Sequence, residues 1–195
     1  MKIIGVIPAR YKSSRLPGKP LKQICGRPMI WWVYNQLKKS NRIDEIYVLT
    51  DDERIENYCK GENIPVLMTS DNHPDHISRV HQASTIIDAD CYVCVNGDEP
   101  LLESIYVDET IPNEIEQDIP LYFGATIKLY DAAKVIDFAN IKLVLNEKNK
   151  CIYMSRNAVP YPRGTLDFCY YKYVGIECYN KAALDFFVNT KMGKA

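Results

Sequence analysis

The first hundred residues alternate short apolar runs with stretches in which apolar residues recur every three or four positions. The apolar runs are typical of buried strands and cover residues 3–8, 45–50, 64–68 and 91–96. The periodic stretches predict helices that begin at Pro28, near residue 52 and at Ser78. This order of elements predicts an α/β fold with a parallel sheet covered by helices on both faces.

The second half of the chain has more strand patterns and fewer helical ones. Strands are expected at residues 121–129, 141–146, 151–155 and 170–179, with a tight turn at residues 146–150. We expect these strands to form a mixed or antiparallel extension of the sheet, which could serve as a substrate lid or a dimer surface. A helical pattern at residues 181–188 follows.

Length and charge narrow the class of protein. The 195 residues, of which 47% are hydrophobic, predict one domain over residues 1–195. A formal charge of −1 argues against a nucleic-acid or membrane partner, and no apolar run is long enough to span a bilayer. The seven scattered cysteines favour a reducing cytoplasm. Cys91 and Cys94 lie in a strand pattern and should face opposite sides, which disfavours a metal there.

A basic loop follows the first strand directly. Residues 8–20 contain Arg10, Lys12, Arg15 and Lys19, together with a glycine and three prolines. Such a loop at the carboxyl end of a strand can hold a triphosphate with main-chain N–H groups and cationic side chains. It lacks the glycine spacing of a P-loop and of a dinucleotide-binding loop. The alternative for this segment is a solvated basic turn.

Asp98 is the second candidate for chemistry. It follows a predicted strand and Gly97, at the edge of the sheet where ligands of such folds bind. A carboxylate there can hold Mg²⁺, although a turn aspartate is the alternative. Asp51 and Asp52 are interpreted mainly as helix caps. The histidines at 73, 76 and 81 have uneven spacing and no cysteine nearby in the sequence, so zinc is disfavoured.

These segments resemble the CMP-Kdo synthetase family, the 3-deoxy-manno-octulosonate cytidylyltransferases. The motif Ala-Arg-x-x-Ser-x-Arg-Leu-Pro-Gly-Lys at residues 9–19 is similar to the family's nucleotide-binding signature. The similarity continues in the same order at residues 26–30, 50–53, 68–70, 95–100 and 155–161. The resemblance implies a three-layer, Rossmann-like fold of the nucleotide-diphospho-sugar transferase type.

The resemblance also implies a reaction and a site. An acceptor hydroxyl of a sugar acid would attack the α-phosphorus of CTP, with Mg²⁺ as cofactor and pyrophosphate as leaving group, for lipopolysaccharide or other cell-surface polysaccharide synthesis. A cytoplasmic homodimer is expected. The expected catalytic residues are Arg10, Arg15, Lys19 and Asp98, and Asp98 is also the expected metal ligand. The nucleotide is expected to contact Ala9, Arg10, Ser14, Arg15, Lys19 and Arg79. The acceptor is expected to contact Asn96, Arg156, Tyr161, Tyr173 and Glu177.

The chain departs from the family pattern at several of these positions. His76 replaces a glycine near the expected base site, and Asn96 replaces a glutamine. Tyr173 and Glu177 replace a histidine and a tyrosine, and a carboxylate at 177 is unfavourable beside an anionic acceptor. The family's elements beyond residue 195, with a second magnesium carboxylate, are expected to be absent. A different acid acceptor, another pyrimidine triphosphate, or a non-catalytic nucleotide-binding paralogue are therefore the alternatives.

Overall fold

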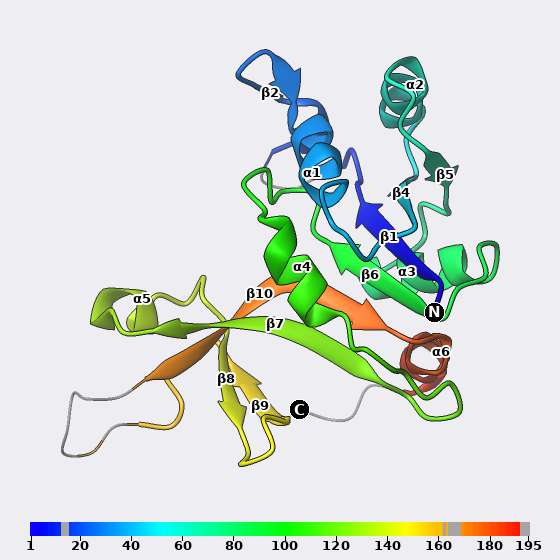
Figure 1. Cartoon of the computed structure of the whole chain (residues 1–195). Coiled ribbons are helices and arrows are strands. Elements are labelled where there is room, and N and C mark those ends of the chain that lie inside the picture. Colours follow the sequence, from blue (N-terminus) through cyan, green and yellow to red (C-terminus); the bar gives the residue numbers. More distant parts are fainter. Residues whose placement is uncertain (13–15, 162, 164–168, 192–195) are drawn as a thin grey trace. The chain divides into compact units, whose positions relative to one another are not determined.

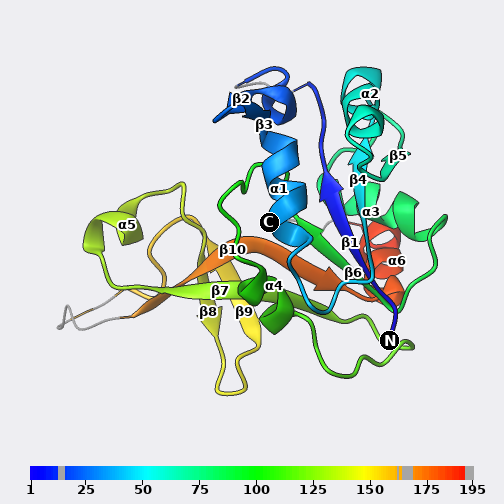
Figure 2. The same ribbon diagram turned by 45° about the horizontal axis from the view of Figure 1, so that its top comes forward.

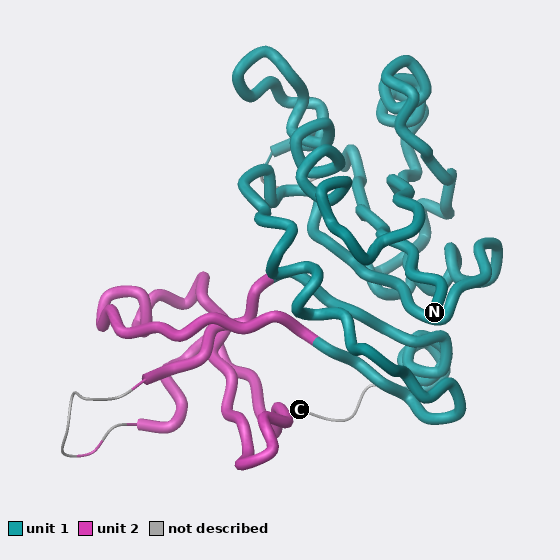
Figure 3. Tube along the Cα trace, in the orientation of Figure 1, with its two compact units in different colours: residues 1–123, 175–195 teal, residues 124–174 magenta. Residues whose placement is uncertain are grey.

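The computed structural model describes residues 1–12, 16–161, 163 and 169–191. The chain divides into two compact units (Figure 3). Unit 1 comprises residues 1–123 and 175–195, and unit 2 comprises residues 124–174. The prediction of a single domain over residues 1–195 stays a prediction.

A mostly parallel sheet forms the centre of unit 1 (Figure 1). Its order is β5-β4-β1-β6-β10, so β1 lies in the middle, as the sequence predicts for the first strand. β1, β4, β5 and β6 are parallel, and β10 runs antiparallel to β6 with Glu177 opposite Cys94. The strands are β1 (Ile3–Pro8), β4 (Glu45–Thr50), β5 (Val66–Met68), β6 (Cys91–Val95) and β10 (Tyr170–Tyr179).

Helices cover both faces of this sheet (Figure 2). Val80 of α3 and Leu184 of α6 pack with Ile4 and Val6 of β1 on one face. Gly5 points to the other face, where an added Cβ would lie 3.2 Å from Leu37 of α1. The helices are α1 (Met29–Leu37), α2 (Glu53–Gly61), α3 (His76–Ser84), α4 (Ser104–Thr110), which packs against α1, and α6 (Lys181–Asn189). These layers confirm the predicted α/β class.

Side-chain caps set the start of three helices of unit 1. Asp52 accepts a hydrogen bond from the Arg54 N–H at the start of α2, which confirms its predicted capping role. Asp75 caps α3, so this helix begins at His76 rather than at Ser78 as the sequence predicted. Asn180 caps α6 in the same way. A short 3₁₀ turn η1 (Lys19–Leu21) and the small strands β2 (Gln23–Ile24) and β3 (Arg27–Pro28) connect β1 to α1.

Unit 2 is built from antiparallel strands, as predicted for this part of the chain. β8 (Lys142–Leu145) and β9 (Cys151–Ser155) form a hairpin closed by a hydrogen bond from Asn146 N–H to the Lys150 carbonyl. β8 also pairs with the first residues of β10. β7 (Tyr122–Leu129) and α5 (Ala132–Ile136) complete the elements. Among the helices of the described residues, none has both the length and the apolar character to cross a membrane.

Candidate active site

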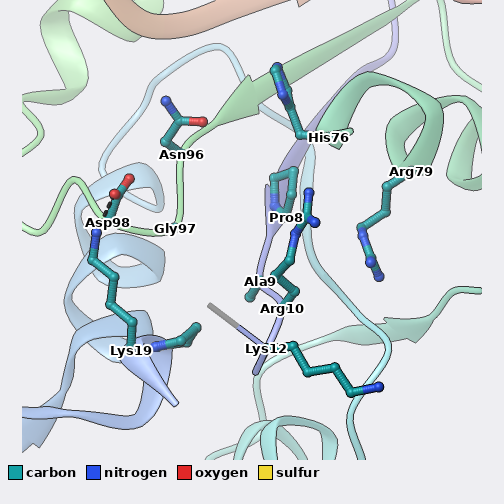
Figure 4. A pocket seen from close by; sticks show the side chains of 11 residues that line it. Pro8, Ala9, Arg10, Lys12, Lys19, His76, Arg79, Asn96, Gly97 and Asp98 are labelled. Atoms are coloured by element: carbon teal, nitrogen blue, oxygen red, sulfur yellow. Dashed lines mark hydrogen bonds and ion pairs between the residues drawn. The ribbon is translucent and has the colours of Figure 1, made fainter. Parts of the chain in front are cut away.

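A cavity of about 320 Å³ opens at the carboxyl ends of β1 and β6 (Figure 4). The two strands are parallel neighbours, so the segments that follow them meet at one edge of the sheet. This topology brings Ala9 and Arg10 together with Asn96 and Asp98. The lining residues are Pro8, Ala9, Arg10, Lys12, Lys19, Pro20, His76, Arg79, Asn96, Gly97 and Asp98.

Gly97 lets the two strand ends approach each other. A Cβ at this position would lie 2.8 Å from the carbonyl oxygen of Pro8, closer than real side chains come. The sequence pattern shows Gly97 only as the residue before Asp98. Position 97 must be glycine because of its contact with the end of β1, which is distant in the sequence.

The basic loop is closed by its own main chain and by one aromatic ring. Gly18 has φ of +68° and donates its N–H to the Tyr11 carbonyl at 2.8 Å. A Cβ at Gly18 would lie 2.9 Å from the Tyr11 ring. On this ring stacks Arg54 of α2, whose guanidinium carbon lies 3.3 Å from the ring centroid. Gly18 then starts the 3₁₀ turn that delivers Lys19 to the cavity.

Lys19 and Asp98 form an ion pair across the cavity (Figure 4). Their side chains are 31% and 44% exposed, so both remain accessible to a ligand. Arg10 and Lys12 line the same cavity. The structure therefore brings the basic loop and the strand-end aspartate to one place. The carboxylate of Asp98, next to these cationic side chains, is a donor of the type that suits Mg²⁺.

Arg79 lines the cavity, but its guanidinium also has structural partners. It is 2% exposed, donates to the Thr69 hydroxyl and pairs with Asp51 at 2.9 Å. These bonds join α3 to the segments after β4 and β5. Asp51 therefore serves as the partner of Arg79, which corrects the interpretation of Asp51 as mainly a helix cap. The role of Arg79 at the nucleotide stays a prediction.

Glu177 is buried beneath the cavity wall. It is 6% exposed, and its carboxylate lies 2.9 Å from Nε2 of His76. This hydrogen bond is the main cause that raises the pKa of His76. Cys94 joins them, with one donor atom of each residue within 4.8 Å of the others. The sequence predicted no cysteine near the histidines, but the structure places Cys94 close to His76. The reason is the register of β6 with β10, which puts Cys94 opposite Glu177.

Asn96 directly follows the last residue of β6 and lines the cavity. Its main-chain N–H donates to the Gly175 carbonyl at 3.3 Å, and a Cβ at Gly175 would lie 2.1 Å from Asn96 Nδ2. The side chain of Asn96 thus occupies the space that Gly175 leaves open, next to the cavity.

The remaining expected site residues are not placed at this cavity. Ser14 and Arg15 lie outside the described residues. Arg156, Tyr161 and Tyr173 belong to unit 2. Arg156 donates to the Phe138 carbonyl at 2.9 Å, and the side chain of Tyr161 is exposed. Their roles in acceptor binding stay predictions.

Comparisons with known proteins place this geometry in context. Residues 4–192 match the family described as Cytidylyltransferase. The chain is 40% identical over 185 residues to a 3-deoxy-manno-octulosonate cytidylyltransferase of Fusobacterium nucleatum, covering 93% of this chain and 74% of that protein. It is 33% identical over 199 residues to an 8-amino-3,8-dideoxy-manno-octulosonate cytidylyltransferase of Shewanella pealeana, covering 100% of this chain and 81% of that protein.

A solved structure agrees with these sequence relatives. CMP:2-keto-3-deoxy-manno-octonic acid synthetase complexed with CTP superposes with a TM-score of 0.91 at 32% identity, covering 99% of this chain and 80% of that chain. The match extends over nearly all of the fold and both segments that form the cavity. The chain therefore belongs to the cytidylyltransferase family of nucleotidyltransferases, as its motifs predicted.

Proposed function

We propose that this protein couples CTP to a Kdo-like sugar acid and releases pyrophosphate. The observation that carries the proposal is the meeting of Lys19 with Asp98 in a cavity that Arg10 and Lys12 also line. Relatives named as cytidylyltransferases for 3-deoxy-manno-octulosonate and its 8-amino analogue define the class of acceptor. The product, a CMP-sugar, suits the synthesis of lipopolysaccharide or another cell-surface polysaccharide in the cytoplasm.

The residues of the cavity supply charge and position for this transfer. Attack of an acceptor hydroxyl on the α-phosphorus builds negative charge on the departing pyrophosphate. Arg10, Lys12 and Lys19 can neutralise that charge and hold the triphosphate in line with the acceptor. The Arg10 main-chain N–H is proposed to orient the nucleotide, whereas the Ala9 N–H is donated to the Leu49 carbonyl at 2.8 Å, so Ala9 contributes only by lining the cavity. We infer that Ser14 and Arg15 of the same loop contribute to nucleotide binding.

Asp98 is the residue we propose for Mg²⁺. The ion, when bound, would neutralise phosphate oxygens and help align the reacting groups. The ion pair with Lys19 holds the Asp98 carboxylate at the cavity. We propose that Arg79 lies on the nucleotide side of the site. The residues proposed to contact the acceptor are Asn96, Arg156, Tyr161 and Tyr173.

A homodimer is the proposed assembly. β9 is the last strand in the order of the sheet and is therefore an edge strand. Its residues Ile152, Tyr153 and Met154 are 65%, 59% and 41% exposed. An apolar edge strand is a surface that proteins normally cover. A second copy of this chain is the proposed cover.

A second candidate function is transfer to an acid other than 3-deoxy-manno-octulosonate. The observation that favours it is the pair of His76, which lines the cavity, with the buried Glu177, at positions where the family motif has a glycine and a tyrosine. A non-catalytic nucleotide-binding paralogue would instead bind CTP without turnover.

Pyrophosphate release with CTP, Mg²⁺ and a panel of sugar acids tests the proposal. We expect release with at least one acid, and a loss of about 100-fold or more in kcat for each of Asp98→Asn and Lys19→Ala. Asp98→Asn weakens the proposed Mg²⁺ ligand, and Lys19→Ala removes a cation from the reacting phosphates. His81→Gln is the control, since His81 pairs with Asp185 away from the cavity. Tight CTP binding without release for any acid would contradict the proposal and support the paralogue.

A further inference from the structure

His76 stands at one end of the cavity. It is the first residue of α3, and the cap by Asp75 fixes it there. Its side chain is 37% exposed and lines the cavity, whereas its partner Glu177 is only 8% exposed. In Figure 4, His76 and Asn96 lie at the end of the cavity away from Lys12 and Lys19. The two ends of the site therefore present different side chains.

Burial makes Glu177 depend on His76. An ionised carboxylate with so little exposure is costly unless a cation or several donors compensate it. Nε2 of His76 lies 2.9 Å away and contributes a charged donor to that compensation. The arrangement thus favours an imidazolium above a carboxylate, with the cation on the side of the cavity.

The other charged and titratable groups that face His76 do not reverse the preference for the charged imidazolium. Asp75, before it in the chain, favours the charged ring, and Arg10 from the loop after β1 opposes it. Cys94 on β6 is the third neighbour, and burial raises the pKa of its thiol, which stays neutral. The hydrogen bond to Glu177 outweighs the rest, so the pKa of His76 is raised.

The same three side chains could be considered as a metal site. His76, Cys94 and Glu177 offer donor atoms within 4.8 Å of one another. Their present bonding fits an ion pair better: Nε2 is already bonded to the carboxylate, and the buried thiol would first have to lose a proton. Metal binding is therefore an outcome that the experiment must separate.

We propose that His76, held as an imidazolium by Glu177, binds the carboxylate of the acid acceptor. This inference rests on the proposed function. With Nε2 bonded to Glu177, the N–H on Nδ1 is the second donor of the charged ring. Anionic oxygens could come from the acceptor or from CTP. The acceptor is favoured because Figure 4 shows His76, with Asn96, at the end of the cavity away from Lys12 and Lys19. Glu177 is then a positioning residue rather than a group that contacts the acceptor.

Steady-state kinetics with 3-deoxy-manno-octulosonate, or with the acid that supports turnover, test the proposal. His76→Gln should raise the KM for the acid about tenfold and change the KM for CTP about twofold at most, because a charged hydrogen bond is lost at one substrate only. His81→Gln on the same helix is the matched control and should leave both unchanged. A rise in the KM for CTP alone would mean that the anion is the triphosphate; no change in either would mean a structural role. Both results overturn the proposal.

The pH profile gives a second test. The wild-type KM for the acid should be low below the raised pKa of His76, where the ring is charged, and should rise as pH passes through that pKa. Glu177→Gln removes the main cause of the shift, so the same rise should begin at lower pH. Identical profiles for the two proteins would contradict the role assigned to Glu177.

Nuclear magnetic resonance titration of His76 provides a readout without turnover. We expect its pKa to lie above 6.5, to fall in Glu177→Gln, and to rise further when the sugar acid is added. No response to the acid overturns the proposal, as does one equivalent of Zn²⁺ binding to His76 with release of the Cys94 proton. If the acid shifts His76 but no acid gives pyrophosphate release, the proposed reaction fails while the binding role stands. If turnover occurs and His76 does not respond, only the binding role fails.

Discussion

Gly97 decides how closely the two strands of the active site can meet. Its Cα faces the Pro8 carbonyl at a distance that leaves no room for a methyl group. The neighbouring residue, Asp98, depends on this contact because its carboxylate must reach Lys19 on the basic loop. The chemistry of the site therefore rests on a residue that has no functional group.

Gly97→Ala should destabilise the protein by about 1–3 kcal/mol and lower kcat, since the new methyl group meets main chain that cannot rotate away. Gly61→Ala is the matched control, because no atom lies within 4 Å of an added Cβ at this helix residue. The control should be neutral or stabilising by about 0.5–1 kcal/mol. Urea unfolding measures both, and equal stability of the two variants would contradict the close approach.

The sequence identified Lys19 and Asp98 because each follows a strong strand pattern in a parallel-sheet context, and such strand ends meet. It could not identify the His76–Glu177 pair. These residues are 101 positions apart, and their contact depends on the antiparallel register of β10 with β6. A shift of one residue in that register would turn Glu177 to the other face of the sheet.

Among the elements, the helix α3 contains a buried charge, Arg79. Arg79 ties this helix to the strand ends through Asp51 and Thr69, and its side chain is almost fully buried. Sequence periodicity predicted α3 and the central strands with bounds close to those observed. It did not predict the short helices α4 and α5, in which seven and five residues are too few to display a period.

Arg79→Met should cost about 3 kcal/mol or more in the free energy of unfolding, because it leaves the Asp51 carboxylate without its partner in a poorly solvated place. Arg27→Met is the control: Arg27 pairs with Glu62, but the two side chains are 48% and 31% exposed, so about 1 kcal/mol or less is expected. Thermal or urea unfolding of both variants measures the difference. Similar losses would mean that the Arg79–Asp51 pair is no more important than a surface pair.

For the whole protein, family and fold class were accessible from the sequence, because the basic loop and the strand-end aspartate occur in the order and spacing of a cytidylyltransferase. The division into two compact units was not accessible. It depends on how strands in the second half of the chain pair with one another, and local patterns do not specify long-range partners.

The proposed dimer makes a prediction at this level. Light scattering after size-exclusion chromatography should give the mass of two chains for the wild type. Ile152→Lys should shift it towards one chain, because a charge is placed on the apolar edge strand. Ile86→Lys is the control, since Ile86 is 57% exposed in unit 1 and outside that strand. A wild-type protein that runs as one chain would contradict the assembly.

The stacking of Arg54 on Tyr11 has a consequence for how this enzyme tolerates change. Arg54 is not among the residues that line the cavity, yet it supports the ring against which Gly18 of the basic loop packs. In a survey of random substitutions scored by growth or turnover, position 54 should rank with the active-site positions, and neighbouring surface positions of the same helix should not.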